Sequence, residues 1–89
     1  MNLFLIHCGF YDHEITSGVY EFHVNIPVVA ENLEEAKKKV RLESAFIAKK
    51  MHIDGIQELK MVSGYHIKAE LSESSSMRTD IKTHLHRDL

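Results

Sequence analysis

Apolar and polar positions alternate along the first third of the chain with the period of two that is typical of β-strands. The segment Leu3 to Phe10 is almost entirely apolar, as expected for a strand inside a sheet. Tyr11 to Gly18 contains turn-forming residues and no apolar period, which predicts a loop. Val19 to Ala30 alternates again, and Pro27 places this second strand at a sheet edge or a bulge, because proline donates no ladder hydrogen bond.

The alternation also predicts which side chains share a face. One face of the first strand carries Phe4, Ile6, Cys8 and Phe10, and the other carries Leu3, Leu5, His7 and Gly9. One face of the second strand carries Tyr20, Phe22, Val24, Ile26 and Val28, and the other carries Glu21, His23 and Asn25. Each strand therefore has one strongly apolar face that requires a cover.

The pattern changes to a helical period after Ala30. Asn32 is a typical N-cap residue, and Glu35 three residues later completes a capping-box pattern. Apolar residues at helical spacing follow at Leu33, Ala36, Val40, Ile47 and Met51. These features predict a single helix that ends between Phe46 and Lys50.

Two further strands are predicted, Ile56 to Val62 and Tyr65 to Leu71, joined around Ser63-Gly64. A two-residue turn would divide the apolar side chains of this hairpin between its two faces. A three-residue loop with a left-handed Gly64 pairs Met61 with Tyr65 and keeps the apolar set together, so this register is expected.

These elements predict an α+β fold of ββαββ order. We expect a two-layer domain with a four-stranded, mostly antiparallel sheet in the order 2-1-3-4 and one main helix on one face. Residues 1–71 form this single domain, and residues 72–89 form a polar linker and a tail. Met77, Ile81, Leu85 and Leu89 repeat every four residues in the tail, which fits either a short C-terminal helix or disorder.

The helix can cover only one face of the sheet. Leu3 and Leu5 point to the other face, where they would be exposed unless something packs on them. Either the tail helix or a second copy of the chain could cover them, and a homodimer through this face or the tail is therefore expected.

Composition limits the functional classes. The chain has 89 residues, 44% of them hydrophobic, and a formal net charge of -2, which gives no basic surface for nucleic acid or an anionic membrane. No apolar run is long enough to span a membrane, and Leu3 to Ile6 is too short for the core of a signal peptide. Cys8 is the only cysteine, so no disulfide forms within the chain, and a reducing, cytoplasmic location is expected.

Histidine is the unusual feature, with 7 residues in the chain. If the first two strands form a hairpin, a register that pairs His7 with His23 brings two imidazoles within reach of one metal ion. His52 and Asp54 could supply further ligands, and the same groups could act in acid–base chemistry. In the alternative interpretation, the histidines are solvated strand and turn residues. No cofactor is indicated, and whether the chain is an enzyme stays open.

Other reactive groups have simpler interpretations. Cys8 lies on the apolar face of its strand, which predicts a buried, unreactive thiol. The basic run Lys37 to Lys39 with Arg41 lies within helical pairing distance of Glu34 and Glu35, which predicts a solvated helix face.

Three clusters resemble a known family. They are Glu21-Phe22-His23 with the following Val28-Val29, His52-Ile53-Asp54 leading to Glu58-Leu59, and Val62 to Ile67 across the last hairpin. In this order and spacing the chain resembles the bacterial domain of unknown function 1543 family from about Leu3 to about Ile67. The family usually has Asp-Gly at Ser63-Gly64, an aromatic residue at Ile56 and a tyrosine-like residue at His7. The resemblance implies a bacterial protein but no activity, substrate or cofactor, since the family's function is unassigned.

Two functional hypotheses follow. The first is a non-catalytic binding or assembly module, favoured by the uncovered sheet face and the lack of a catalytic motif. The second is a metal- or ligand-binding domain, enzymatic or not, that uses His23, His52 and Asp54. The two differ in whether those three side chains converge on one pocket.

Overall fold

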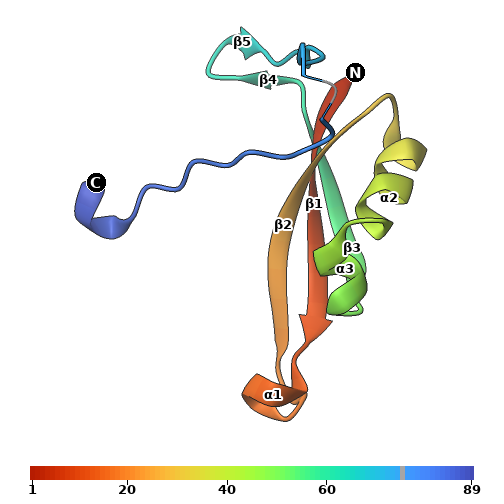
Figure 1. The fold of residues 1–89 in the computed structure, drawn as a ribbon, viewed down its shortest axis with the longest axis vertical. Helices are drawn as coiled ribbons and strands as arrows, with labels where there is room; N and C mark the ends of the chain where they lie inside the picture. Colours follow the sequence, from red (N-terminus) through yellow and green to blue (C-terminus); the bar gives the residue numbers. More distant parts are fainter. Residues whose placement is uncertain (75) are drawn as a thin grey trace.

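A computed structural model describes residues 1–74 and 76–89. It has the predicted α+β composition, drawn in Figure 1. In chain order the elements are β1 (Asn2–Tyr11), α1 (His13–Thr16), β2 (Glu21–Ala30), α2 (Leu33–Arg41), α3 (Ser44–Ala48), β3 (His52–Leu59), β4 (Met61–Val62), β5 (Tyr65–His66) and the 3-10 helix η1 (His86–Asp88).

The main sheet has three antiparallel strands in the order β2-β1-β3. The doubly apolar first strand is central and the proline-bearing strand is at an edge, as predicted. Figure 1 shows α2 and α3 running along the sheet, with the β4–β5 hairpin at one end and α1 at the other. The hairpin forms a separate two-stranded sheet, so the prediction of a four-stranded sheet is wrong.

The hydrophobic core lies on one face of this sheet. Residues opposite one another in antiparallel strands share a face, and β1 pairs Phe4 with Val28, Ile6 with Ile26 and Cys8 with Val24. The buried hydrophobic residues are Phe4, Ile6, Cys8, Val28, Ala30, Ala36 and Val40. The last two come from α2, which therefore covers the face predicted from the alternation of apolar residues. We call the opposite face, which carries Leu3, Leu5, His7, Gly9 and their neighbours, the open face.

The predicted single helix is two helices. Its start is as expected, because Asn32 caps α2 and its Oδ1 accepts a hydrogen bond from the Glu35 amide at 2.9 Å. Glu43 is extended, with φ -64° and ψ 135°, and separates α2 from α3. The break turns the chain so that Phe46 packs against the core while Ile47 is 61% exposed. A continuous helix with the predicted stripe would have buried Ile47, and this part of the prediction is wrong.

The last hairpin has a two-residue turn, not the three-residue loop that its apolar pattern predicts. Val62 pairs with Tyr65 across a two-residue turn, in which Ser63 and Gly64 have φ values of 54° and 84°. Such values match the tight type I′ turn of hairpins. The predicted positive φ of Gly64 is confirmed, but the three-residue loop is wrong. Because this hairpin is exposed, burial of one face does not constrain its register, and the turn preference decides it.

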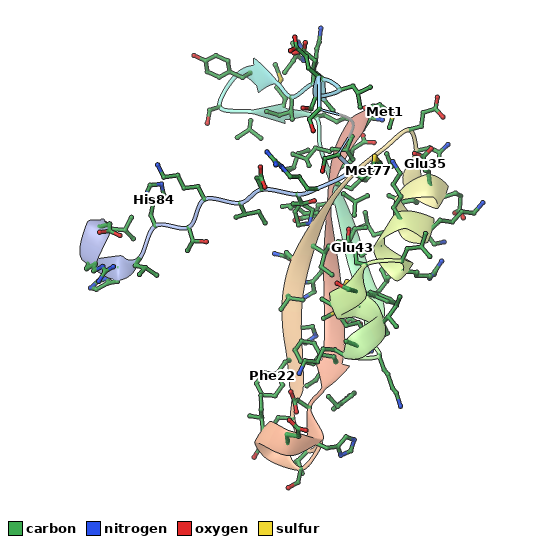
Figure 2. The ribbon with its side chains drawn as sticks, in the orientation of Figure 1. Met1, Phe22, Glu35, Glu43, Met77 and His84 are labelled. Carbon is green, nitrogen blue, oxygen red and sulfur yellow. The ribbon has the colours of Figure 1, made fainter. Side chains whose placement is uncertain are left out.

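The tail is not the long helix that its apolar repeat could have formed. Its regular structure among the described residues is the short η1, and Met77, Ile81, Leu85 and Leu89 are all exposed. Figure 2 shows Met77 close to the sheet and His84 where the tail leads away from it. No helix among residues 1–74 and 76–89 is long and apolar enough to cross a membrane.

Candidate functional site

The site begins with a glycine in the middle of three strands. Gly9 on β1 lies opposite His23 on β2 and opposite His52 on β3, so the two imidazoles flank it on the open face. The predicted pairing of His7 with His23 is wrong by two residues, since His7 lies opposite Asn25. The rings of His7 and His23 are nevertheless neighbours, stacked with centroids 4.8 Å apart and planes 5° apart.

A β-bulge places Asp54 beside His52. Cys8 pairs with Ile53 and His7 with Gly55, which leaves Asp54 as an additional residue in β3. Both Ile53 and Ile56 pack against the core, although their spacing of three residues does not fit an unbroken strand. The bulge adds one residue to the strand, so that Ile53 and Ile56 both stay on the core face while His52 and Asp54 face the open side.

The three predicted site residues converge. The Asp54 carboxylate contacts both imidazoles: Oδ2 lies 3.0 Å from His23 Nε2, and Oδ1 lies 3.1 Å from His52 Nε2. The two histidines come from opposite edges of the sheet, and Asp54 joins them above β1. The second functional hypothesis requires His23, His52 and Asp54 to lie this close together.

Glu21 is a fourth member that the sequence prediction missed. Its Oε1 lies 2.5 Å from His23 Nε2 and 3.4 Å from His52 Nε2. The sequence contained a signal for it, since Glu21 is two residues from His23 on the same face of the strand. Figure 2 labels Phe22, the residue between them, near the α1 end of the sheet, which locates the site there.

Gly9 provides the space in which these groups meet. A Cβ atom at this position would lie 2.5 Å from Glu21 Oε1, 2.6 Å from Asp54 Oδ2 and 2.6 Å from His52 Nε2. All three are polar side-chain atoms of the site, so any larger residue would displace them. An isolated glycine inside an apolar strand is a recognised sign of such close approach, and this signal was also available in the sequence.

Tyr11 holds the second oxygen of Glu21. Its hydroxyl donates a hydrogen bond to Glu21 Oε2 at 2.8 Å. This bond lowers the pKa of the Glu21 carboxyl, and the neighbouring histidines act in the same direction. The same bond raises the pKa of the Tyr11 phenol, because ionisation would remove the donor and place a charge beside the carboxylate. The hydrogen bond thus favours the ionised form of Glu21 and leaves Oε1 facing the imidazoles.

Glu21, His52 and Asp54 could hold a metal ion. One ligand atom from each lies within 4.8 Å of the others. Their side chains are 27%, 45% and 32% exposed, and His23 is 40% exposed, so an ion could reach them from solvent. Without a metal, the same arrangement is a network of imidazole and carboxylate pairs that could exchange protons.

The other groups considered from the sequence lie elsewhere. Cys8 is buried on the core face, and burial raises the pKa of its thiol, in agreement with an unreactive cysteine. Lys37 pairs with Glu34 at 3.3 Å and Lys39 with Glu35 at 3.0 Å, so these two lysines of the basic run are in ion pairs on the helix surface.

Comparison with known proteins gave no match. No family model, no curated protein and no solved structure is significantly similar to this chain.

Proposed function

We propose that this chain is a divalent-metal-binding domain. The observation that carries the proposal is the convergence of Glu21, His52 and Asp54 over Gly9, with His23 against the same two carboxylates. Two imidazoles and two carboxylates from the edge strands β2 and β3 meet above the central strand β1, where Gly9 has no side chain.

The donor set favours zinc or a similar transition metal. Imidazole nitrogen suits zinc, iron, copper and nickel, whereas magnesium and calcium prefer sites made of oxygen ligands. Zinc ligands lie about 2.0–2.2 Å from the ion. The side chains can close the remaining distance by small rotations, because each of them is at least 27% exposed. Three protein ligands and a solvent-facing position would make an open coordination site of the kind used to bind or activate a small ligand.

A hydrogen bond to the far side of one candidate ligand supports the same proposal. Residues that bind metals are usually oriented by hydrogen bonds to their remaining polar atoms. Tyr11 provides such a bond to Glu21 Oε2. The resemblance to the domain of unknown function 1543 family would extend the proposal to that family, because the clusters that carry the resemblance contain Glu21, His23, His52 and Asp54. We also propose that the protein is bacterial and cytoplasmic.

Thermal unfolding with and without zinc tests the function. A metal that binds only the native state raises its stability by RT ln(1 + [L]/Kd), which is about 2.7 kcal/mol at 100 times Kd. We expect zinc to raise the melting temperature of the full chain, and calcium or magnesium to have little effect. His52→Ala and Asp54→Ala should each abolish the rise while leaving the melting temperature of the metal-free protein nearly unchanged.

Two matched controls make the result specific. His66→Ala removes an exposed histidine of β5, which belongs to the separate hairpin, and should keep the full response. The double variant His84→Ala/His86→Ala removes the tail histidines and should also keep it. A zinc response that survives His52→Ala but disappears in the tail variant would move the metal to the tail and refute the proposed site.

An assembly module is the second candidate, and the other half of the open face favours it. Towards the end of the sheet near Met1, the open face carries Leu3, Leu5, Pro27, Val29 and Leu59. A groove of about 750 Å³ runs beside it and is lined by Leu3, Pro27, Val29 and Leu42 together with Met77 and Ile81 of the tail. We propose that a second copy of the chain packs on this apolar half, as expected for a homodimer.

Light scattering on the full chain tests the dimer. We expect the mass of two chains, and Val29→Glu should convert the protein to a monomer, because a charge would be placed in the apolar contact. Glu34→Lys on the exposed face of α2 is a control that should not affect assembly. A monodisperse wild-type monomer at high concentration would refute the dimer and leave the metal site unaffected.

A further inference from the structure

The metal site contains more donor atoms than one ion requires. Glu21, His52 and Asp54 form the compact set that places one atom from each within 4.8 Å. His23 lies outside that set, yet its Nε2 is in contact with the same two carboxylates. The position of His23 therefore needs its own explanation.

The Asp54 carboxylate divides its two oxygens between the two histidines. Oδ1 faces His52 Nε2 at 3.1 Å and Oδ2 faces His23 Nε2 at 3.0 Å. Glu21 contributes a single oxygen, Oε1, that contacts both imidazoles. Di-metal carboxylate centres combine histidine and carboxylate ligands around two ions in this way, and the two ions of such sites lie about 3.5–4 Å apart.

We propose that the site holds two divalent cations, one on the His52 side and one on the His23 side, with Asp54 and Glu21 bridging them. This inference rests on the proposed metal-binding function. The first ion uses His52, Asp54 Oδ1 and Glu21 Oε1, and the second uses His23, Asp54 Oδ2 and the same Glu21 oxygen. The partial exposure of all four side chains leaves solvent-facing positions on each ion for water or a further ligand.

His7 and Asn25 fix the His23 half of the site. An amide oxygen can only accept, so the 2.8 Å contact between Asn25 Oδ1 and His7 Nδ1 requires His7 to donate there. The His7 ring is thereby anchored, and it stacks face to face on His23. The stack holds the plane of the His23 ring and keeps its Nε2 over the carboxylates. This support is the kind that metal ligands usually receive from neighbouring groups.

Metal stoichiometry tests the inference directly. Manganese and zinc are each added to the full chain, and the bound metal is measured after equilibrium dialysis. We expect two ions per chain, and with manganese an electron paramagnetic resonance spectrum of two coupled ions. His23→Ala should reduce the stoichiometry from two to one and remove the coupling, whereas His66→Ala should keep both ions.

The possible results separate the two proposals. One ion per wild-type chain, whether or not it needs His23, would overturn the paired centre and leave the metal-binding function intact. No bound ion would refute both. Two ions that persist in His23→Ala but fall to one in His84→Ala/His86→Ala would place the second ion in the tail and overturn the paired centre.

Discussion

The two faces of the three-stranded sheet are made by the same strands but have opposite chemistry. On one face, Ile6 and Cys8 are fully buried beneath α2 and its neighbours. On the other, Gly9 and the residues beside it support exposed imidazoles and carboxylates. Stability and the candidate chemistry are therefore separated by the alternation of side chains along β1. Substitutions on one face should change stability, and those on the other should change binding.

The largest expected effect is on the core face. Ile6→Ala should lower the free energy of unfolding by about 2–5 kcal/mol, because it removes a completely buried side chain and leaves a cavity. Val29→Ala, on the open face and 40% exposed within one chain, should cost less than about 1 kcal/mol when measured at a concentration low enough to dissociate the proposed dimer. Urea denaturation of both variants measures the difference. Equal losses would mean that the open face is as buried in solution as the core face.

Gly9→Ala should separate binding from stability most clearly. The added Cβ would collide with Glu21 Oε1, Asp54 Oδ2 and His52 Nε2, which are the ends of partly exposed side chains that can swing away. We expect at least a tenfold loss of zinc affinity by calorimetry and a loss of less than about 2 kcal/mol in unfolding free energy. Gly55→Ala, where a Cβ would have nothing within 4 Å, is the matched control and should bind zinc normally.

A smaller effect concerns the ion pair that joins the end of α3 to the residue that follows β1. Lys49 Nζ contacts the buried Asp12 carboxylate at 2.8 Å, and this contact lowers the pKa of Asp12. Because the folded pKa lies below the unfolded value of about 3.9, the pair stabilises the protein above that pH and the contribution is lost as the pH falls through the folded pKa.

Lys49→Met should therefore be less stable than the wild type near pH 6, and the two should converge as the pH approaches about 2. Melting temperatures of both proteins across this range provide the measurement. Lys50→Met, next to it in the chain, is the control and should follow the wild type. A stability difference independent of pH would show that Lys49 acts by packing on Phe10, whose ring lies 6.0 Å from its Nζ, and not through Asp12.

The smallest effect is expected in the separate hairpin. Gly64 has a φ of 84°, so Gly64→Ala should cost about 1 kcal/mol locally, because a Cβ is disfavoured in the left-handed region. Hydrogen exchange should show faster opening of the β4–β5 amides, with β1 amides unchanged. If β1 amides exchange faster by the same factor, the hairpin and the main sheet unfold as one unit.

The elements with strong local patterns were predictable. Alternation gave the faces of β1 and β2, and the cap at Asn32 gave the start of α2, because each depends on residues adjacent in sequence. The end of α2 was not predictable from local pattern. The extended Glu43 brings Phe46 to the core, and this depends on packing between distant parts of the chain. The hairpin register was predicted wrongly for the opposite reason. The prediction required one face of the hairpin to be buried, whereas both of its strands are exposed.

The candidate site divides in the same way. Its residue types were set by the sequence: His23 on the outward face of a strand, His52 and Asp54 one residue apart, and a glycine within an apolar run. Their convergence was decided by pairing between distant segments, which placed β3 beside β1 with a bulge at Asp54 and so brought His52 across from His23. Local periodicity determines which face a side chain occupies, but only strand order and register, set by packing of the whole core, determine which side chains meet.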